Sequence, residues 1–409
     1  MGFHLQGSLA RIVRHDFCTH TASVPRMSGQ RKIVFIKSGR WSHSNEATRT
    51  VLTREFSDHQ LIIVDVDIEL LGRRLVNLMN WCHVWWHYGR DLTTRRRTFR
   101  ECVYRTPWIY CTIRRWIKGR IQEHLSDLDF TLQTQSLYDA SSDGVPHFVF
   151  TDHTHLANLD YPDFDPSLLF PHDWMDLERR IYAHAEVNFT MSQHVARSLI
   201  EQYDCPPARV KCVYAGSNTP VHPEATNPDR YRRKRILFNG LFWDRKGGPD
   251  LLAAFLIVLQ RHPDARLIIL GCHPPIDLPN CEVLGWRPLA EVPRCYADAS
   301  VFCLPTRNEP FGIVIVEAMM HKLPIVSTTI GAVPDMVENA TNGYLIRPGD
   351  VNALAEALIK LLDSPETCAR FGEASLIRAR ERFTWEAAGG RMAEGIRAAL
   401  SARRRASIG

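Results

Sequence analysis

The chain has 409 residues and a formal net charge of +5, with 45% hydrophobic and 23% charged residues. That composition is typical of a globular protein and excludes a fibrous or wholly disordered one. The length exceeds what one hydrophobic core usually serves, so two or three domains are expected.

The cysteines and the hydropathy of the sequence indicate the cellular compartment of the protein and its relation to membranes. The 11 cysteines show no Cys-x-x-Cys spacing, and their odd number favours free thiols in a reducing compartment. No stretch reaches the ~18 consecutive apolar residues that a membrane-spanning helix needs. The sequence therefore predicts a cytoplasmic protein, with peripheral attachment to a membrane left open.

Residues 1–30 are interpreted as an N-terminal extension without fixed structure. They carry several Arg, His and Ser and lack the apolar run of a secretory signal peptide. An organelle-targeting peptide is the alternative, and Met27 offers a second translation start just before the first predicted strand.

Apolar strands alternating with helices predict an N-terminal α/β domain over residues 31–220. Continuous apolar strands are typical of a parallel sheet that helices cover on both faces. The expected strands lie at residues 31–36, 60–65, 147–151, 186–190 and 210–214, with a helix at 44–55 and helical segments on both sides of the fourth strand.

Residues 221–234 are interpreted as a linker, because prolines punctuate a segment without apolar periodicity. A second Rossmann-like domain follows over residues 235–385, and a last helix with a basic tail over 386–409. Ligands of two such domains bind in the cleft between them, outside the carboxyl ends of the strands. The expected elements of the second domain are strands at 235–239, 266–270, 301–304 and 324–327 and helices at 249–261, 289–298 and 312–321.

Glu309 and Glu317 bracket the most informative stretch of the sequence. Glu309 follows a predicted strand, and Gly312 opens the next predicted helix. Unpaired backbone N–H groups and the positive end of the helix dipole make such a junction a ready anion site. Two carboxylates beside it can accept hydrogen bonds from hydroxyls on either side of a bound phosphate, which suits a sugar attached to a nucleotide diphosphate.

The Glu-x7-Glu arrangement, followed by Ala318-Met319 and later by Gly331-Ala332-Val333-Pro334, resembles the signature of retaining glycosyltransferases of family four, or group 1. The resemblance implies an α/β fold of the GT-B type, with two Rossmann-like domains facing across a cleft and a last helix that crosses back. It also implies hexosyl transfer from a GDP- or UDP-linked sugar to a polysaccharide, glycolipid or other glycan acceptor. No metal or other cofactor is expected.

A basic loop between a predicted strand and helix matches the family's diphosphate-binding element at Gly240, Lys246 and Gly247. Leu241 departs from the pattern, because the family has an Arg there, and Arg245 is the candidate for the missing cation. A solvated basic turn is the plainer interpretation of this Arg-Lys pair. By resemblance, the donor-binding residues are Gly39, Gly240, Arg245, Lys246, Glu309, Phe311, Gly312, Ile313, Val314 and Glu317.

The expected catalytic residues are Lys246, Arg245, Glu309 and His153. Lys246 and Arg245 would neutralise the charge that grows on the leaving diphosphate. The family often has a His near the reacting carbon, and His153 matches it by register after a predicted strand, with His155 as the alternative. A structural role for both histidines remains open, as does the role of Gly216.

Asp65 and Asp67 follow a predicted strand with Asp-x-Asp spacing, which binds Mg or Mn in the other major glycosyltransferase fold. Short acidic pairs at strand ends are common, and the second domain favours the metal-free fold. We therefore expect no metal site here.

Residues 90–120 hold ten Arg and Lys, with several aromatic residues interleaved or adjacent. Such a segment suits an anionic membrane surface or a polyanionic acceptor, with nucleic acid the less favoured partner. An ordinary basic helix with its aromatic side chains in the core is the plainer interpretation.

Two alternatives to a glycosyltransferase stay open. A non-catalytic subunit that binds a sugar nucleotide or glycan would tolerate Leu241 in the diphosphate loop. Another GT-B enzyme, such as a sugar-nucleotide epimerase, would share the fold. The base of the donor leaves no readable pattern, although residues 284–286 are placed to contact it.

Overall fold

The computed structural model describes residues 30–39, 41–219 and 228–406. The extension predicted for residues 1–30 therefore lies outside the described residues apart from its last one, as do residues 221–227 of the predicted linker. The rest of that linker, Pro228–Arg233, forms a 3-10 helix that leads into the second domain.

The N-terminal domain is built on a six-stranded parallel sheet with the order β2-β1-β3-β4-β5-β6. Its central strands are buried on both faces, which explains their continuous apolar runs. The strands are β1 (Lys32–Lys37), β2 (Gln60–Asp65), β3 (Leu128–Thr134), β4 (His147–Thr151), β5 (Val187–Thr190) and β6 (Val210–Cys212). The α-helices are α1 (Ser44–Glu55), α2 (Val66–Glu69), α3 (Arg74–Thr93), α4 (Phe99–Cys102), α5 (Pro107–Gln122), α6 (His172–Ala183) and α7 (Gln193–Glu201).

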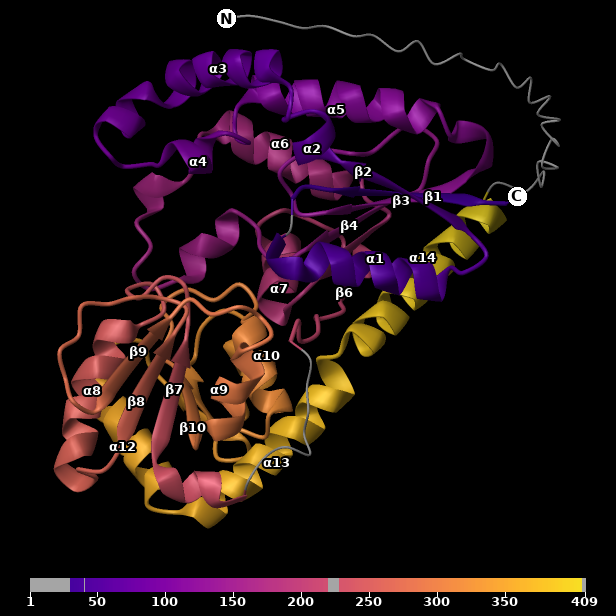
Figure 1. Cartoon of the computed structure of the whole chain (residues 1–409). Coiled ribbons are helices and arrows are strands. Elements are labelled where there is room, and N and C mark those ends of the chain that lie inside the picture. The colour runs from indigo at the N-terminus through magenta and orange to yellow at the C-terminus, as the bar shows by residue number, and fades with distance from the viewer. Residues whose placement is uncertain (1–29, 40, 220–227, 407–409) are drawn as a thin grey trace, which may run out of the picture.

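The C-terminal domain repeats this architecture with the strand order β12-β11-β10-β7-β8-β9, again all parallel. The strands are β7 (Arg235–Asn239), β8 (Arg266–Leu270), β9 (Cys281–Gly285), β10 (Val301–Leu304), β11 (Ile325–Thr328) and β12 (Gly343–Ile346). The α-helices are α8 (Gly248–Arg261), α9 (Val292–Asp298), α10 (Ile313–Met320), α11 (Val333–Met336), α12 (Val351–Leu362) and α13 (Pro365–Arg382). Figure 1 shows the two sheets stacked end to end.

One central strand, β3, is absent from the elements that the sequence predicts. Its sequence mixes polar and apolar residues, yet it lies between β1 and β4 and is almost wholly buried. The buried amide of Gln133 explains how the polar residues are accommodated, because it donates to the carbonyl oxygens of Gln135 and Tyr138 at 2.8 Å each. Buried polar groups that are hydrogen-bonded in this way carry no hydropathy signal of a strand.

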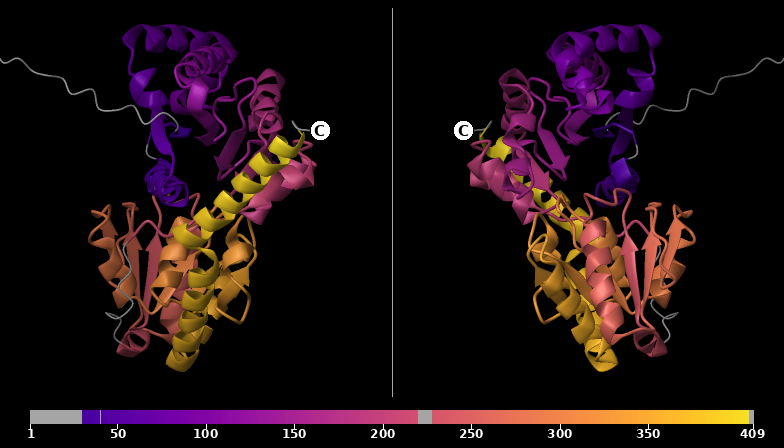
Figure 2. Two further views of the ribbon diagram at one scale, coloured as in Figure 1. Left: turned by 90° about the vertical axis from the view of Figure 1, so that its right-hand side faces the viewer. Right: turned by 90° about the vertical axis from the view of Figure 1, so that its left-hand side faces the viewer.

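The last helix, α14 (Trp385–Ala406), leaves the C-terminal domain and runs along the N-terminal one (Figures 1 and 2). It packs closely there, since a Cβ atom on Gly395 would lie 2.7 Å from the ring of Phe189 in β5. Near its end, Arg403 pairs with Glu186 at 2.6 Å. The chain thus crosses between the domains twice.

Candidate functional site

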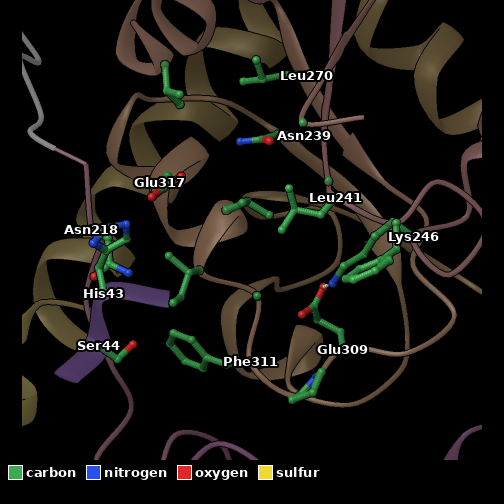
Figure 3. A pocket seen from close by; sticks show the side chains of 18 of the residues that line it. His43, Ser44, Asn218, Asn239, Leu241, Lys246, Leu270, Glu309, Phe311 and Glu317 are labelled. Atoms are coloured by element: carbon green, nitrogen blue, oxygen red, sulfur yellow. Dashed lines mark hydrogen bonds and ion pairs between the residues drawn. The ribbon is translucent and has the colours of Figure 1, made fainter. Parts of the chain in front are cut away.

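A cavity of about 500 Å³ lies between the two domains, at the carboxyl ends of both sheets. Figure 3 shows its labelled residues, with His43, Ser44 and Asn218 on one side and Lys246 and Glu309 on the other. The N-terminal domain contributes Trp41, His43, Ser44, Asp152, Met191 and Asn218. The ends of β7 and β8, the loops after β7, β8, β9 and β10, and the starts of α9 and α10 provide the remainder.

Lys246 and Glu309 form a buried ion pair at the wall of the cavity. Lys246 lies in the turn between β7 and α8, and Glu309 in the loop after β10. Burial lowers the pKa of the Lys246 ammonium, while the negative charge of Glu309 opposes that shift. Gly247 makes the turn feasible, because its φ is +74° and a Cβ atom would lie 1.8 Å from the carbonyl oxygen of Pro305. The pair therefore holds a cation in place where a ligand can reach it.

The N-terminus of α10 opens into the same cavity. Gly312 caps the helix with a φ of +98°, a conformation that side-chain-bearing residues rarely adopt. The helix begins at Ile313, and its first amides precede the helix's own hydrogen bonds. Phe311, Gly312, Ile313 and Val314 all line the cavity. A positive helix end thus lies beside the ammonium of Lys246, which makes this wall suited to a phosphate.

Glu317 lines the cavity one helical turn further along α10. Its Oε2 accepts a hydrogen bond from the Tyr296 hydroxyl at 2.9 Å, and that hydroxyl accepts one from Asn239 Nδ2 at 2.8 Å. Burial raises the pKa of Glu317 to about 7, although the Tyr296 hydroxyl and groups of Asn218 and Thr219 counteract it by hydrogen bonding. The carboxyl group is therefore held in a fixed orientation, close to its point of ionisation at neutral pH.

Nine of the ten predicted donor-binding residues line this cavity, and Gly39 does not. Gly39 adopts a φ of +56°, and a Cβ atom there would lie 2.8 Å from Asp67 Oδ2, so packing accounts for this glycine. Arg245 lines the cavity with an exposed side chain, whose Nη1 lies 3.4 Å from the carbonyl oxygen of Asn308. Leu241, where the family has an Arg, also lines the cavity and is 66% exposed.

His153 is not among the lining residues, whereas its neighbour Asp152 is. The His153 ring stacks on Tyr161 with 6.1 Å between centroids, and burial lowers its pKa to about 4. His155 accepts the backbone N–H of Phe170 at 2.8 Å, which is a structural role. Burial raises the pKa of the Asp152 carboxyl to about 6. The N-terminal domain thus brings the titratable side chains of Asp152 and His43 to the cavity, and His153 is not among them.

The structure also places Gly216 and Trp286, which the sequence analysis singled out. Gly216 lies under the start of α14, where a Cβ atom would be 2.4 Å from the backbone nitrogen of Trp385. Trp286, in the segment proposed to contact the base, lines the cavity with a largely exposed ring. An exposed aromatic ring at a cavity wall is a surface on which a base can stack.

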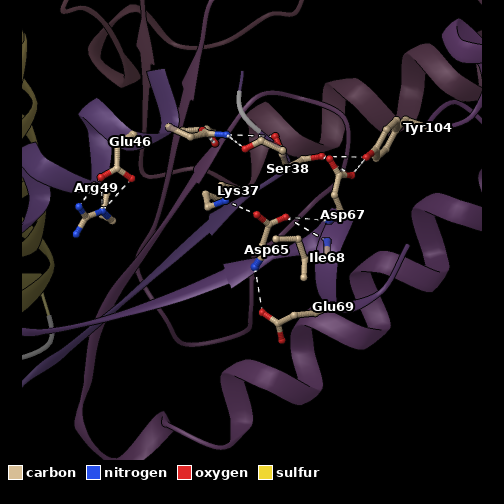
Figure 4. A network of polar contacts seen from close by, with 12 residues as sticks. Lys37, Ser38, Glu46, Arg49, Asp65, Asp67, Ile68, Glu69 and Tyr104 are labelled. Carbon is tan, nitrogen blue, oxygen red and sulfur yellow. Dashed lines mark hydrogen bonds and ion pairs between the residues drawn. The ribbon is translucent and has the colours of Figure 1, made fainter. Parts of the chain in front are cut away.

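Asp65 and Asp67 take part in a network of local contacts (Figure 4). Asp65 pairs with Lys37 and accepts the backbone N–H groups that begin α2. Asp67 accepts hydrogen bonds from the Ser38 and Tyr104 hydroxyls. No group of three metal-ligating side chains occurs in the described part of the chain.

The aromatic residues of the basic segment 90–120 are largely packed against the domain. Tyr110 is buried, and Trp108 stacks on His83 with 5.1 Å between ring centroids. Arg97 is buried and pairs with Asp91 at 2.9 Å. The exposed tryptophans next to this segment, Trp81, Trp85 and Trp86, belong to α3.

His43, Ser44, Asp152 and Asn218 line the cavity but were missed by sequence reasoning. His43 and Ser44 stand at the start of α1, after the loop that follows β1. Their position could have indicated this role, because they follow the loop at the carboxyl end of the central strand β1, and ligands of such folds bind at that end of the sheet. Asn218 has no such signal, and it reaches the cavity as the chain leaves the N-terminal domain.

Two Rossmann-like domains that face each other across a cavity are the arrangement of the GT-B class of fold. Solved structures agree: sucrose-phosphate synthase from Thermosynechococcus elongatus matches with a TM-score of 0.67 at 16% identity, covering 91% of this chain and 100% of that one. HepE from Anabaena, in complex with UDP and glucose, matches with a TM-score of 0.60 at 16% identity, covering 89% and 98%. These likenesses show the fold.

Residues 233–364 match the family described as Glycosyl transferases group 1, and the family resemblance drawn from Glu309 and Glu317 is confirmed. The D-inositol 3-phosphate glycosyltransferase of Corynebacterium glutamicum is 29% identical over 238 residues, which are 51% of this chain and 56% of that one. The same enzyme of Thermobispora bispora is 28% identical over 285 residues, or 61% and 64%. The chain thus spans between half and two thirds of the length of these curated relatives.

Proposed function

We propose that this chain is a retaining glycosyltransferase that takes its sugar from a GDP- or UDP-linked donor. The observation that carries the proposal is the buried Lys246–Glu309 pair beside the N-terminus of α10, at the wall of the interdomain cavity. A cation and a positive helix end that converge on one cavity wall suit a diphosphate. The GT-B fold and the group 1 match support the same activity.

In the proposed reaction, the charge that grows on the leaving diphosphate is met by Lys246, Arg245 and the first amides of α10. Stabilising that charge is the largest electrostatic requirement of glycosyl transfer. Glu309 orients Lys246 and contacts the donor sugar, and Glu317 accepts hydrogen bonds from the ribose hydroxyls. The departing phosphate takes the proton of the acceptor hydroxyl. With the cationic groups supplied by the protein, the proposed mechanism uses no metal ion.

The donor and the acceptor are proposed only as classes. HepE, a neighbour by fold, was solved with UDP and glucose, which supports UDP among the candidate nucleotides. The acceptor is proposed to be a polysaccharide, a glycolipid or another glycan. We propose a cytoplasmic site of action, since ten cysteines of the described residues are free thiols.

A non-catalytic sugar-nucleotide-binding subunit is the second candidate, and Leu241 is the observation that favours it. An apolar side chain at the family's arginine position leaves one cation fewer at the diphosphate. Binding without transfer would be the outcome that separates this candidate from an enzyme.

The test is a thermal-shift panel of UDP, GDP, ADP and their common sugar conjugates. A ligand at 100 times its Kd stabilises the folded state by about 2.7 kcal/mol, which gives an easily measured shift. We expect one nucleotide to shift the wild type and not Lys246→Met, which keeps the apolar stem but removes the charge. Lys360→Met, on an exposed face of α12, is the matched control and should shift like wild type.

Thermal shift and nucleotide release together distinguish an enzyme from a non-catalytic subunit. No shift with any nucleotide would contradict the donor site. A shift in the wild type without release of free nucleotide from the sugar conjugate, with or without added glycan acceptors, would favour the non-catalytic subunit. Loss of nucleotide release in Glu309→Gln, with the wild-type shift retained by Lys360→Met, would support the enzyme.

A further inference from the structure

Helix α3 turns its apolar face toward solvent. Leu75, Leu78, Met79, Cys82, Trp85 and Trp86, named here the α3 stripe, recur at the spacing of one face of a helix, an arc of roughly 120°. Such a pattern normally marks the face that packs on the core. Here Trp86 is 86% exposed, Leu75 76%, and Leu78, Met79 and Trp85 each more than half. The apolar pattern therefore faces outward.

The opposite face of α3 is already packed on its own domain. Val84 and Tyr88 are buried there, and the Tyr88 hydroxyl donates to the carbonyl oxygen of Arg105. Asn80, also buried, donates from Nδ2 to the carbonyl oxygen of Val103 at 2.8 Å. Because these contacts fix the rotation of the helix, α3 cannot roll to bury the stripe without losing them. The stripe is thus a fixed outward surface.

Positive charge surrounds the stripe. Residues 70–100 contain seven arginines and a single carboxylate, Asp91, which pairs with the buried Arg97. At 3.6 residues per turn, Arg74 and Arg90 fall on opposite margins of the stripe. Neither forms an ion pair with any residue of the described ranges, and both are exposed. The partner of this surface should therefore be apolar within and negatively charged around its contact.

We propose that the α3 stripe docks the protein on an anionic lipid bilayer. An amphipathic helix of this kind lies in the membrane interface with its apolar side chains among the acyl chains, and its cations then meet the lipid phosphates. Tryptophan is enriched at this depth of a bilayer. Among the described residues, no helix has both the length and the hydropathy to cross a membrane, so the contact is peripheral.

The position of α3 makes docking compatible with an accessible cavity. Figure 1 shows α3 at the far side of the N-terminal domain from the C-terminal domain, and Figure 2 agrees. A bilayer seated on α3 would leave the interdomain cavity on the water side. The proposal rests on α3 alone and does not depend on glycosyl transfer.

The charge around the α3 stripe favours a bilayer over a second copy of this chain as its partner. A two-fold contact between two stripes would bring Arg74 and Arg90 of one copy near the same arginines of the other, and like charges repel across such an interface. An anionic bilayer instead supplies the opposite charge around an apolar interior. The basic margins therefore favour lipid over self-association.

The experiment is co-sedimentation of the full chain with vesicles of phosphatidylcholine, alone or mixed with phosphatidylglycerol. We expect binding to the mixed vesicles that weakens as salt is raised. Trp85→Ser/Trp86→Ser should weaken it by roughly 100-fold, since most of the buried apolar area is lost. Arg74→Glu/Arg90→Glu should weaken it by roughly tenfold or more.

The matched controls carry the same changes on exposed residues of the C-terminal domain. Leu256→Ser/Ile377→Ser and Arg347→Glu/Arg380→Glu should bind the mixed vesicles as wild type does. Equal binding to both kinds of vesicle, or no binding to either, would overturn the proposal. So would a dimer on gel filtration that only Trp85→Ser/Trp86→Ser dissociates, because the stripe would then be covered by a second copy.

Discussion

At the scale of single residues, Leu241 is the clearest departure from the pattern of group 1. It lines the cavity with an exposed side chain, at the position where the family motif that the sequence resembles has an Arg. Arg245, at the other end of the loop, is exposed, and its Nη1 lies 3.4 Å from Asn308 Oδ1. The proposed diphosphate site therefore relies on the buried Lys246 more than a two-cation site would.

A restored cation at residue 241 should strengthen donor binding. We expect Leu241→Arg to lower the Kd for the bound nucleotide by roughly tenfold, because a charge-assisted hydrogen bond to phosphate adds about 1.5 kcal/mol or more. Isothermal titration calorimetry would measure the change. Leu289→Arg adds the same charge at another position of the cavity wall and is the control. Equal gains in both variants would indicate general charge attraction rather than a defined phosphate position.

Glu317 links stability to pH. Burial raises its folded-state pKa to about 7, whereas an unfolded glutamate titrates near about 4.3. Between these values the folded state holds a proton that the unfolded state has lost, so this group's contribution to stability falls as pH rises. Glu317→Gln removes the titration and should gain roughly 2–4 kcal/mol over wild type between pH 4 and pH 8.

Denaturant unfolding at a series of pH values would measure that gain. The difference between Glu317→Gln and wild type should widen steadily from pH 5 to pH 7 and then level off. A difference that stays constant across this range would contradict the raised pKa.

The sequence predicted the cavity-lining residues of the C-terminal domain more completely than those of the N-terminal domain. Lys246 occurs in one motif of fixed spacing and Glu309 and Glu317 in another, so neighbours along the chain marked each of them. Asp152 directly follows the predicted strand 147–151, but nothing in the sequence distinguishes it from the polar residues beside it, and Asn218 has no such position to mark it. Their contribution depends on contacts between segments far apart in the sequence.

At the scale of elements, the turn between β7 and α8 is the most constrained part of the site. Gly247→Ala would force a left-handed φ on a side-chain-bearing residue and press its Cβ against the carbonyl oxygen of Pro305. We expect a loss of about 2–4 kcal/mol in the free energy of unfolding, together with weaker nucleotide binding. Gly119→Ala is the control, because a Cβ there meets no atom within 4 Å inside α5, and it should stabilise by up to about 1 kcal/mol.

Chemical denaturation of both variants would measure these changes. If the two glycine variants changed stability alike, steric constraint at Gly247 would not be the cause. The nucleotide affinity of Gly119→Ala should equal that of wild type in either case.

Strands were predicted best where their sequence is continuously apolar. The predicted strands 60–65, 147–151 and 235–239 coincide with β2, β4 and β7. β3 was not predicted, because hydrogen-bonded Gln and Thr side chains occupy several of its buried positions. The predicted helix 289–298 begins later, at Val292, just before Pro293, a residue suited to a first helical turn. In α3 the periodicity is present, but hydropathy alone does not say which face meets the core.

At the scale of the whole molecule, alternating strands and helices were sufficient to predict two α/β domains, and the family resemblance implied their GT-B arrangement. The contacts that hold the domains together were not predictable. Arg307 pairs with Asp250 of its own domain and with Asp163 of the other, at 2.8 Å each. The backbone N–H of Gln193 donates to Asp335 across the same interface at 2.8 Å. Such pairs join loops that carry no common signal in the sequence.

The path of α14 has a consequence for how the protein is made. A ribosome delivers the N-terminal domain first, and domains generally begin to fold as they emerge. Phe189 in β5 and Val51 in α1 both pack against glycines of α14, which are synthesised about 200 residues or more later. Until those last residues leave the ribosome, this flank of the first domain remains uncovered. The N-terminal domain is therefore completed last, although it is synthesised first.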